Sequence, residues 1–175
     1  MPFGQFAKRS IFEALGMSNT VVYDDRNMAL PDYATGYIAD ESGEFRIKHY
    51  WNYTVPGDGK VYSTVRDLFL WDQNFYRGTV GGRKFAETML ACGSLNDGQK
   101  CKYAFGLDRG EFAPAEHRGL PIVTHGGSCA GGQAVMIRFV QQRLTVILLC
   151  NTRNPRFNDL AFRVADIFLD ALHHS

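Results

Sequence analysis

Apolar residues in the last third of the chain fall into two runs separated by a short polar connection. The run Leu144–Cys150 is nearly continuous, which is typical of a strand covered on both faces. Ala134–Phe139 comes before it, and Gln141-Gln142-Arg143 joins the two. We therefore expect two neighbouring antiparallel strands here.

Two further strands are expected upstream of this pair. Tyr103–Arg109 is one candidate, and Ile122–His125 is the other, ending in a turn eased by Gly126-Gly127. After the turn-like stretch 151–155, a helical spacing of apolar residues predicts an amphipathic final helix. That spacing is set by Leu160, Val164, Ile167, Phe168 and Ala171.

The first hundred residues show helical spacing and long polar stretches. Phe6, Ile11 and Leu15 recur at helical spacing, and Gly16 is placed to end that helix. Residues 21–60 are rich in turn formers, so loops are expected, with short strands around 34–39 and 44–49.

Thr64-Val-Arg-Asp67 fits a capping box at the start of a second helix, which should stop before Gly78. A shorter helix over Arg83–Cys92 should end at Gly93. The pattern predicts an α/β fold of the α+β type, organised as one unit over residues 1–175. Residues 1–100 form a helix and loop part, and residues 101–175 form antiparallel strands with a terminal helix.

Composition narrows the functional classes. The chain has 175 residues, 45% hydrophobic, enough for one packed core. With 19 Lys and Arg against 18 Asp and Glu, no basic surface for nucleic acid or an anionic membrane is expected. No apolar run approaches the roughly 20 residues of a membrane span, and the first residues do not look like a secretory signal.

The four cysteines and five histidines do not predict a metal site. There is no C-x-x-C and no H-x-x-x-H spacing, so neither metal nor cofactor is expected. Cys92 and Cys101 flank a polar loop. They could form a disulfide in an oxidising compartment or stay reduced as small apolar residues, and the sequence leaves their redox state open.

The best candidate for chemistry is His125-Gly126-Gly127, followed by Ser128. Glycine has no Cβ, so the backbone there can approach a ligand closely. The alternative is a turn histidine whose glycines serve only the backbone geometry.

The surrounding pattern resembles the C-terminal part of the serine β-lactamase-like hydrolases, which include class C β-lactamases, DD-peptidases and related esterases. The resemblance rests on several blocks in the expected order. They are Ile11–Thr20, Gly57–Trp71, Tyr103–Leu107, His125–Gly132 and the strands to Asn151. It implies a partial β-lactamase/transpeptidase-like fold.

The resemblance also implies roles for the histidine motif. A Lys/His-x-Gly motif lies on the strand that faces the nucleophile, so His125 would help to hold a substrate carboxylate or carbonyl. The Ser128 N–H would supply one arm of an oxyanion hole. His125, Gly126, Gly127 and Ser128 are therefore the expected substrate-binding wall.

The departures from the family are equally informative. Its members use a serine followed three residues later by lysine, and a tyrosine that carries protons. No Ser-x-x-Lys occurs in this chain. Tyr50-Trp51-Asn52 matches Tyr-x-Asn, but it follows the Leu15-Gly-Met17 block that the family's motif precedes. We therefore expect no nucleophile and no general base in this chain.

Three functions remain open. The chain could be the C-terminal part of a serine hydrolase, inactive alone, whose substrate is a β-lactam, a D-alanyl peptide or an ester. It could be a non-catalytic binding module derived from that fold. It could also be an enzyme that uses Cys129 with His125. The resemblance suggests a periplasmic or cell-surface location, although the family also has cytoplasmic esterases.

The resemblance also predicts partners. In the family, strands from the N-terminal part lie beside the final strand, so Leu144–Cys150 would present an unpaired edge. Such edges recruit other strands. We expect this edge to pair with an N-terminal half of the same enzyme or to mediate self-association.

Overall fold

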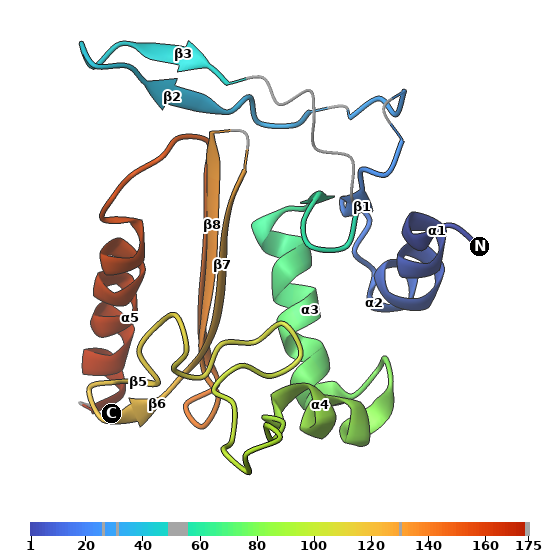
Figure 1. The fold of residues 1–175 in the computed structure, drawn as a ribbon, viewed down its shortest axis with the longest axis vertical. Helices are drawn as coiled ribbons and strands as arrows, with labels where there is room; N and C mark the ends of the chain where they lie inside the picture. The colour runs from blue at the N-terminus through green and yellow to red at the C-terminus, as the bar shows by residue number, and fades with distance from the viewer. Residues whose placement is uncertain (26, 31, 49–55, 130, 174–175) are drawn as a thin grey trace.

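The computed structural model describes residues 1–25, 27–30, 32–48, 56–129 and 131–173 (Figure 1). Its helices and strands come in the following order: α1 (Phe3–Ala7), a π-helical turn (Lys8–Phe12), α2 (Glu13–Leu15), β1 (Val21–Val22), β2 (Tyr37–Ala39), β3 (Phe45–Ile47), β4 (Val61–Tyr62), α3 (Val65–Arg77), α4 (Gly82–Leu90), β5 (Glu116–His117), β6 (Leu120–Pro121), β7 (Val123–Cys129), β8 (Gly132–Phe139), β9 (Leu144–Cys150) and α5 (Phe157–His173).

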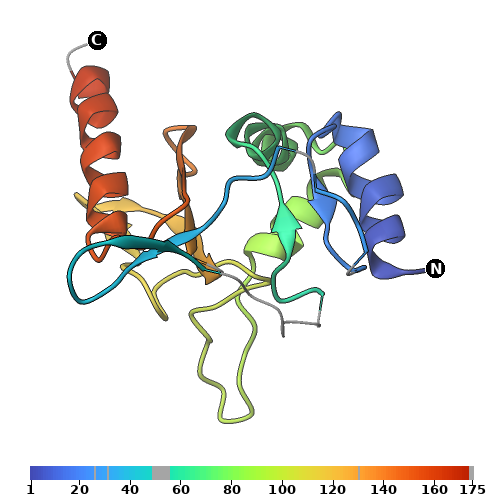
Figure 2. The ribbon, with the colours of Figure 1, turned by 90° about the horizontal axis from the view of Figure 1, so that it is seen from above.

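The centre of the fold is a three-stranded antiparallel sheet in the order β7-β8-β9. Helix α5 covers one face of this sheet and α3 lies on the other side (Figures 1 and 2). The remaining strands form small pairs: β1 with β4, β2 with β3, and β5 with β6. The expected mixture of helices and loops, antiparallel strands and a terminal helix is confirmed.

Helix α5 packs closely on the sheet because its inner face carries small residues at every fourth position. Ala161 and Ala165 are fully buried, and Phe157 and Leu169 extend the same face. They pack against the alternate residues of β8 that face this helix, Val135, Ile137 and Phe139. This face forms the larger apolar core.

The opposite face of the sheet is joined to α3 by a buried ion pair. Arg138 on β8 donates from Nε to Asp72 Oδ1 (2.7 Å) and from Nη2 to the Asp72 carbonyl (3.0 Å). Thr145 on β9 donates to the same carboxylate (2.8 Å), and the Arg138 guanidinium lies 3.8 Å from the ring centre of Phe75. These contacts set how α3 sits on the sheet.

The start of α3 shows why the capping prediction was half right. Thr64 caps the helix by accepting from the Asp67 N–H (3.2 Å), as expected. The Asp67 carboxylate does not reach back to Thr64. It accepts instead from the Asn19 N–H (2.8 Å) and the Thr20 hydroxyl (2.7 Å), and so ties the N-terminal helical segment to α3.

Other boundaries were also expected correctly. Gly16 ends the first helical segment with a left-handed φ of 73°, and α3 ends at Gly78 with φ of 64°. The short strands β2 and β3 fall within the predicted ranges. Helix α4 begins one residue before the predicted Arg83 and ends at Leu90 rather than Cys92, because the backbone of Ala91 is already extended (φ −78°, ψ 124°).

One strand prediction was wrong, and the end of another was placed too early. The stretch Tyr103–Arg109 forms isolated bridges instead of a strand, since its backbone turns back on itself between Tyr103 and Asp108. The strand expected to end at His125 continues through both glycines to Cys129, because β8 pairs with it along that length. A left-handed glycine, Gly131 (φ 82°), follows the strand, and a side chain there would collide with Tyr37.

Within the described residues, all four cysteines carry free thiols, and the Cys101 thiol donates to the Tyr103 carbonyl. No described helix is long and apolar enough to cross a membrane. The Tyr50-Trp51-Asn52 triplet and His49 lie outside the described residues.

The buried ion pair generates a stability prediction. Asp72→Asn should lower the free energy of unfolding by about 3–5 kcal/mol, because the Arg138 guanidinium is left buried without its anion. Urea denaturation near neutral pH measures this. Asp40→Asn is the matched control, since Asp40 pairs with a largely exposed Arg46 and exposed pairs contribute little. Equal losses in the two variants would contradict the assigned role of the Arg138–Asp72 pair.

Candidate functional site

The pairing of β7 with β8 determines which way each residue of the histidine motif faces. Arg138 faces α3, and its cross-strand partner on β7 is Val123. Alternate residues of a strand share a face, so His125 and Gly127 also face the α3 side. Gly126 lies on the α5 side, opposite Val135.

The outer edge of β7 is the edge away from β8. There Thr124 exchanges both backbone hydrogen bonds with Asp108, at 2.8 and 3.0 Å. Bonding directions alternate along an antiparallel strand. The N–H and C=O groups of Gly126 and Ser128 therefore point to this same outer edge, beyond the end of the Asp108 bridge. The Ser128 N–H thus points away from β8, to the outer edge of β7.

Gly127 leaves the surface beside His125 bare. A Cβ built at Gly127 would meet no atom within 4 Å. Gly127 is also absent from the glycines with left-handed backbone. Neither crowding nor backbone geometry therefore requires glycine here, whereas close approach of a ligand would.

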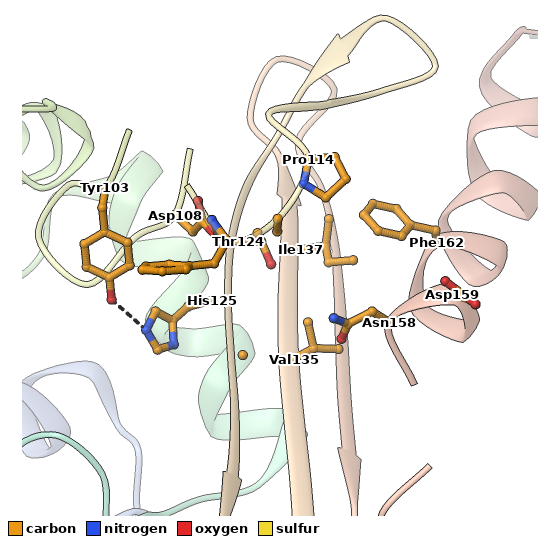
Figure 3. Close-up of a pocket in the computed structure, with 13 residues that line it drawn as sticks. Tyr103, Asp108, Pro114, Thr124, His125, Val135, Ile137, Asn158, Asp159 and Phe162 are labelled. Carbon is orange, nitrogen blue, oxygen red and sulfur yellow. Dashed lines mark hydrogen bonds between the residues drawn. The ribbon is translucent and has the colours of Figure 1, made fainter. Parts of the chain in front are cut away.

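The His125 ring is held by a tyrosine from another part of the chain. Its Nε2 lies 2.8 Å from the Tyr103 hydroxyl, as the dashed line in Figure 3 shows. The Tyr103 ring in turn makes an edge contact with Phe112, with ring centres 5.7 Å apart. Both His125 and Phe112 are exposed, so this cluster forms part of the open surface.

Asp108 orders the loop that carries these aromatic rings. Its buried carboxylate accepts from the backbone N–H groups of Gly110 (2.8 Å), Glu111 (2.8 Å) and Phe112 (2.9 Å). Burial acts to raise the pKa of the Asp108 carboxyl, but these hydrogen bonds favour the charged form. Together with one from Ala113, they hold the pKa below its ordinary value.

An open pocket of about 580 Å³ lies beside this part of β7 (Figure 3). The loop from Tyr103 to Pro114, strands β7 and β8, and the first turns of α5 line it. His125 and Gly126 lie on its wall, whereas Ser128 is not among its lining residues. The lining residues from β8 and α5 belong to the α5 side of the sheet, opposite the face that carries the His125 side chain. The pocket therefore meets the predicted substrate wall only at His125 and Gly126, and Ser128 lies outside it.

The alternative pairing of Cys129 with His125 fails on geometry. Both residues lie on β7, four positions apart, which separates them by roughly 13 Å along an extended strand. The His125 Nε2 bonds to Tyr103 instead. A hydrogen-bonded cysteine–histidine nucleophile needs roughly 3 Å, so β7 cannot form one from these two residues.

The described residues contain no cluster of three His, Cys, Asp or Glu side chains that could hold a metal ion. His117 bonds to Asp166 on α5 (2.7 Å) and stacks on Phe162, with ring centres 4.6 Å apart. His117 therefore helps to hold β5 and β6 against α5.

Sequence reasoning missed Tyr103 and Asp108 as members of the site. Tyr103 was placed in a strand, and Asp108 stood out neither by spacing nor by motif. Their roles depend on a loop that folds back to β7, and single-sequence periodicity does not report such a contact.

The low pKa of Asp108 predicts an acid-sensitive contribution to stability. A group whose folded-state pKa is lowered stabilises the fold above its unfolded-state pKa of about 3.9, and this contribution is lost as the pH falls through the lower folded-state value. Asp108→Asn should destabilise the chain at pH 7 and flatten the pH dependence of unfolding below about pH 4. Parallel urea titrations with the exposed control Asp58→Asn test this, and identical pH profiles for all three proteins would contradict it.

Comparison with known proteins places this chain in a family. The sequence model of the family described as Beta-lactamase matches residues 1–168. The chain is 33% identical over 162 residues to penicillin-binding protein 4* of Bacillus subtilis (strain 168), covering 86% of this chain and 35% of that protein. It is 24% identical over 151 residues to a D-aminopeptidase of Gluconobacter oxydans (strain 621H), covering 85% and 27%.

Solved structures agree in fold. A penicillin-binding protein from Bacillus halodurans matches 94% of this chain and 49% of its own, with a TM-score of 0.72 and 17% identity. The octameric penicillin-binding protein homologue from Pyrococcus abyssi matches 96% and 38%, with a TM-score of 0.75 and 21% identity.

The chain spans about a third of the length of the curated relatives that it matches. The match nevertheless runs through nearly all of the chain, and both solved structures share its arrangement of helices around the antiparallel sheet. The resemblance seen in the sequence is thereby confirmed, and this protein belongs to the Beta-lactamase family of serine hydrolases and penicillin-binding proteins.

Proposed function

We propose that this chain forms one wall of an acyl-transfer site in a serine hydrolase. The observation that carries the proposal is the orientation of β7. It turns the His125 side chain toward α3 and points the Ser128 N–H to the outer edge of the strand. The bare surface at Gly127 leaves room for a substrate between them.

The chemistry follows from fixed dipoles. The β7–β8 ladder holds the Ser128 N–H in place before substrate arrives, so stabilising a developing oxyanion requires no reorganisation. The His125 imidazole can donate to a substrate carbonyl or carboxylate beside it. A β-lactam, a D-alanyl peptide and an ester all present such a carbonyl to a nucleophile.

The nucleophile must come from elsewhere. No Ser-x-x-Lys occurs in the chain. We propose that an N-terminal half supplies the serine, lysine and tyrosine, and that the chain is inactive without them. The longer curated relatives, of which this chain matches 35% and 27%, support a missing half of that kind.

The purified chain should therefore show no hydrolysis of nitrocefin or of a p-nitrophenyl ester above the buffer rate, because no activated nucleophile is present. Spectrophotometric assays with excess chain measure this. His125→Ala is the matched variant, which shows whether any residual hydrolysis depends on His125. The claim of inactivity would be contradicted if the wild-type chain hydrolysed these substrates rapidly and His125→Ala abolished that hydrolysis.

The partner surface is proposed at β9. This strand lies at the end of the sheet order, and its known pairing is with β8 alone among the described strands. Leu149 faces the α3 side and is 42% exposed. Helix α5 packs against β9. Its residues Leu160 and Ile167 are two helical turns apart, so they lie on the same face of the helix, and both are exposed.

We propose that this edge pairs with the N-terminal half and that the isolated chain uses it to associate with itself. Unpaired N–H and C=O groups on an apolar edge act as a template for another strand. The Pyrococcus abyssi homologue is described as octameric, which makes self-association a reasonable outcome to test for this chain.

The same edge supports a second candidate function, a non-catalytic module that binds a peptide by strand addition. A saturable partner of fixed stoichiometry that carries no Ser-x-x-Lys would favour this second candidate. A partner that carries the motif would favour the hydrolase.

The edge proposal predicts that Leu149→Lys reduces self-association, because a charge on an edge strand opposes pairing with another strand. Sedimentation velocity over a range of concentrations measures this. Leu95→Lys is the matched control, since Leu95 is 55% exposed but lies in the connection between α4 and β5 and not on β9. A compact wild-type monomer at every concentration would count against the edge proposal.

A further inference from the structure

We propose that Tyr103 is a positioning residue that sets the tautomer of His125. Its hydroxyl donates to Nε2, which places the imidazole proton on Nδ1, the nitrogen turned away from Tyr103 (Figure 3). The choice of Tyr103 as the donor rests on the proposed function, because it is argued from the acyl substrate that the site would bind, whereas the tautomer can be measured without any substrate.

The contact is short and specific. The Tyr103 oxygen lies 2.8 Å from Nε2, within ordinary hydrogen-bond range. It joins residues 22 positions apart, from a loop and a strand. No other hydrogen bond to the His125 ring is found among the described residues.

Water competes for an exposed ring, so the tyrosine must be held in place to matter. Three features hold it. The Tyr103 carbonyl accepts from the Cys101 thiol (3.0 Å), its backbone bridges Asp108, and its ring makes the edge contact with Phe112. Asp108 in turn binds the backbone N–H of Phe112 (2.9 Å) and pairs with Thr124 on β7. Through Asp108, Tyr103 is therefore held against β7, the strand that carries His125.

The direction of the hydrogen bond follows from what the site must bind. A neutral imidazole has one N–H donor and one acceptor nitrogen, and a partner on one nitrogen determines the role of the other. If Tyr103 accepted from Nε2, Nδ1 would present a lone pair that repels a substrate oxygen. If Tyr103 donates, Nδ1–H becomes a second hydrogen-bond donor on β7, in addition to the Ser128 N–H. An acyl substrate carries only acceptor oxygens at its carbonyl, so the second arrangement is the complementary one.

The test is nuclear magnetic resonance of the ¹⁵N-labelled chain at about pH 8.5, where an ordinary imidazole is neutral. Long-range ¹H–¹⁵N correlations assign the proton to Nδ1 or Nε2. The wild-type chain should show His125 mainly as the Nδ1–H form. Tyr103→Phe removes only the hydroxyl and should move the equilibrium toward Nε2–H by about tenfold, the effect of one ordinary hydrogen bond.

The chain offers two controls. His117, whose Nε2 bonds to Asp166 at 2.7 Å, reports whether the fold is intact and should not change in Tyr103→Phe. Tyr33→Phe removes a hydroxyl from another exposed tyrosine and should leave both histidines unchanged. If Tyr103 had only a structural role, Tyr103→Phe would change the His117 signals as well, or would change neither histidine. It would not change the His125 tautomer alone.

Two results would overturn the proposal. One is a wild-type His125 found as Nε2–H. The other is a His125 tautomer that Tyr103→Phe leaves unchanged. If Tyr103→Phe also disturbs His117, Asp108→Asn decides, since it loosens the loop but keeps the hydroxyl. It should shift the His125 tautomer in the same direction, and no shift would reject the proposal.

Failure of a completed enzyme to hydrolyse acyl substrates would reject the proposed function and leave the tautomer result standing.

Discussion

The register of β7 on β8 is the constraint on which the rest of the site depends. Side chains alternate between the two faces of a strand, so a slip of one residue would exchange every face. In the observed register, Val123 pairs with Arg138 and His125 pairs with Met136. That pairing turns the histidine toward α3, leaves Gly127 bare beside it, and points the Ser128 N–H away from β8. The site wall follows from the backbone ladder before any side-chain contact is counted.

Two buried carboxylates then place the surroundings of that wall. Asp72 binds Arg138 and Thr145, which holds α3 against strands β8 and β9. Asp108 binds three successive backbone N–H groups of its loop and pairs with Thr124, which brings Tyr103 to His125. Both aspartates are almost fully buried, and each carboxylate accepts hydrogen bonds, as a buried charge requires. The surroundings of His125 are thus ordered within this chain, although the sequence contains no Ser-x-x-Lys.

Much of this could be predicted from periodicity and local signals. The apolar run Leu144–Cys150, the helical spacing in α5, the Thr64 cap and the glycine at residue 16 each report a local preference, and the structure follows them. The predictions failed where a long-range contact decides the outcome. Gly126 and Gly127 stay in a strand because β8 pairs with them, and the Asp67 carboxylate turns to Asn19 and Thr20 instead of its own helix. The Tyr103–His125 contact spans 22 residues and leaves no periodic trace in the sequence.

The central claim is that this chain is one wall of a serine hydrolase completed by another polypeptide segment. The most direct measurement is the intact mass of the natural gene product, together with the sequence of any chain that copurifies with it. The account predicts either a product longer than these 175 residues or a bound second chain, with Ser-x-x-Lys and Tyr-x-Asn in the added segment. A natural product of 175 residues that binds no segment with those motifs would contradict the account.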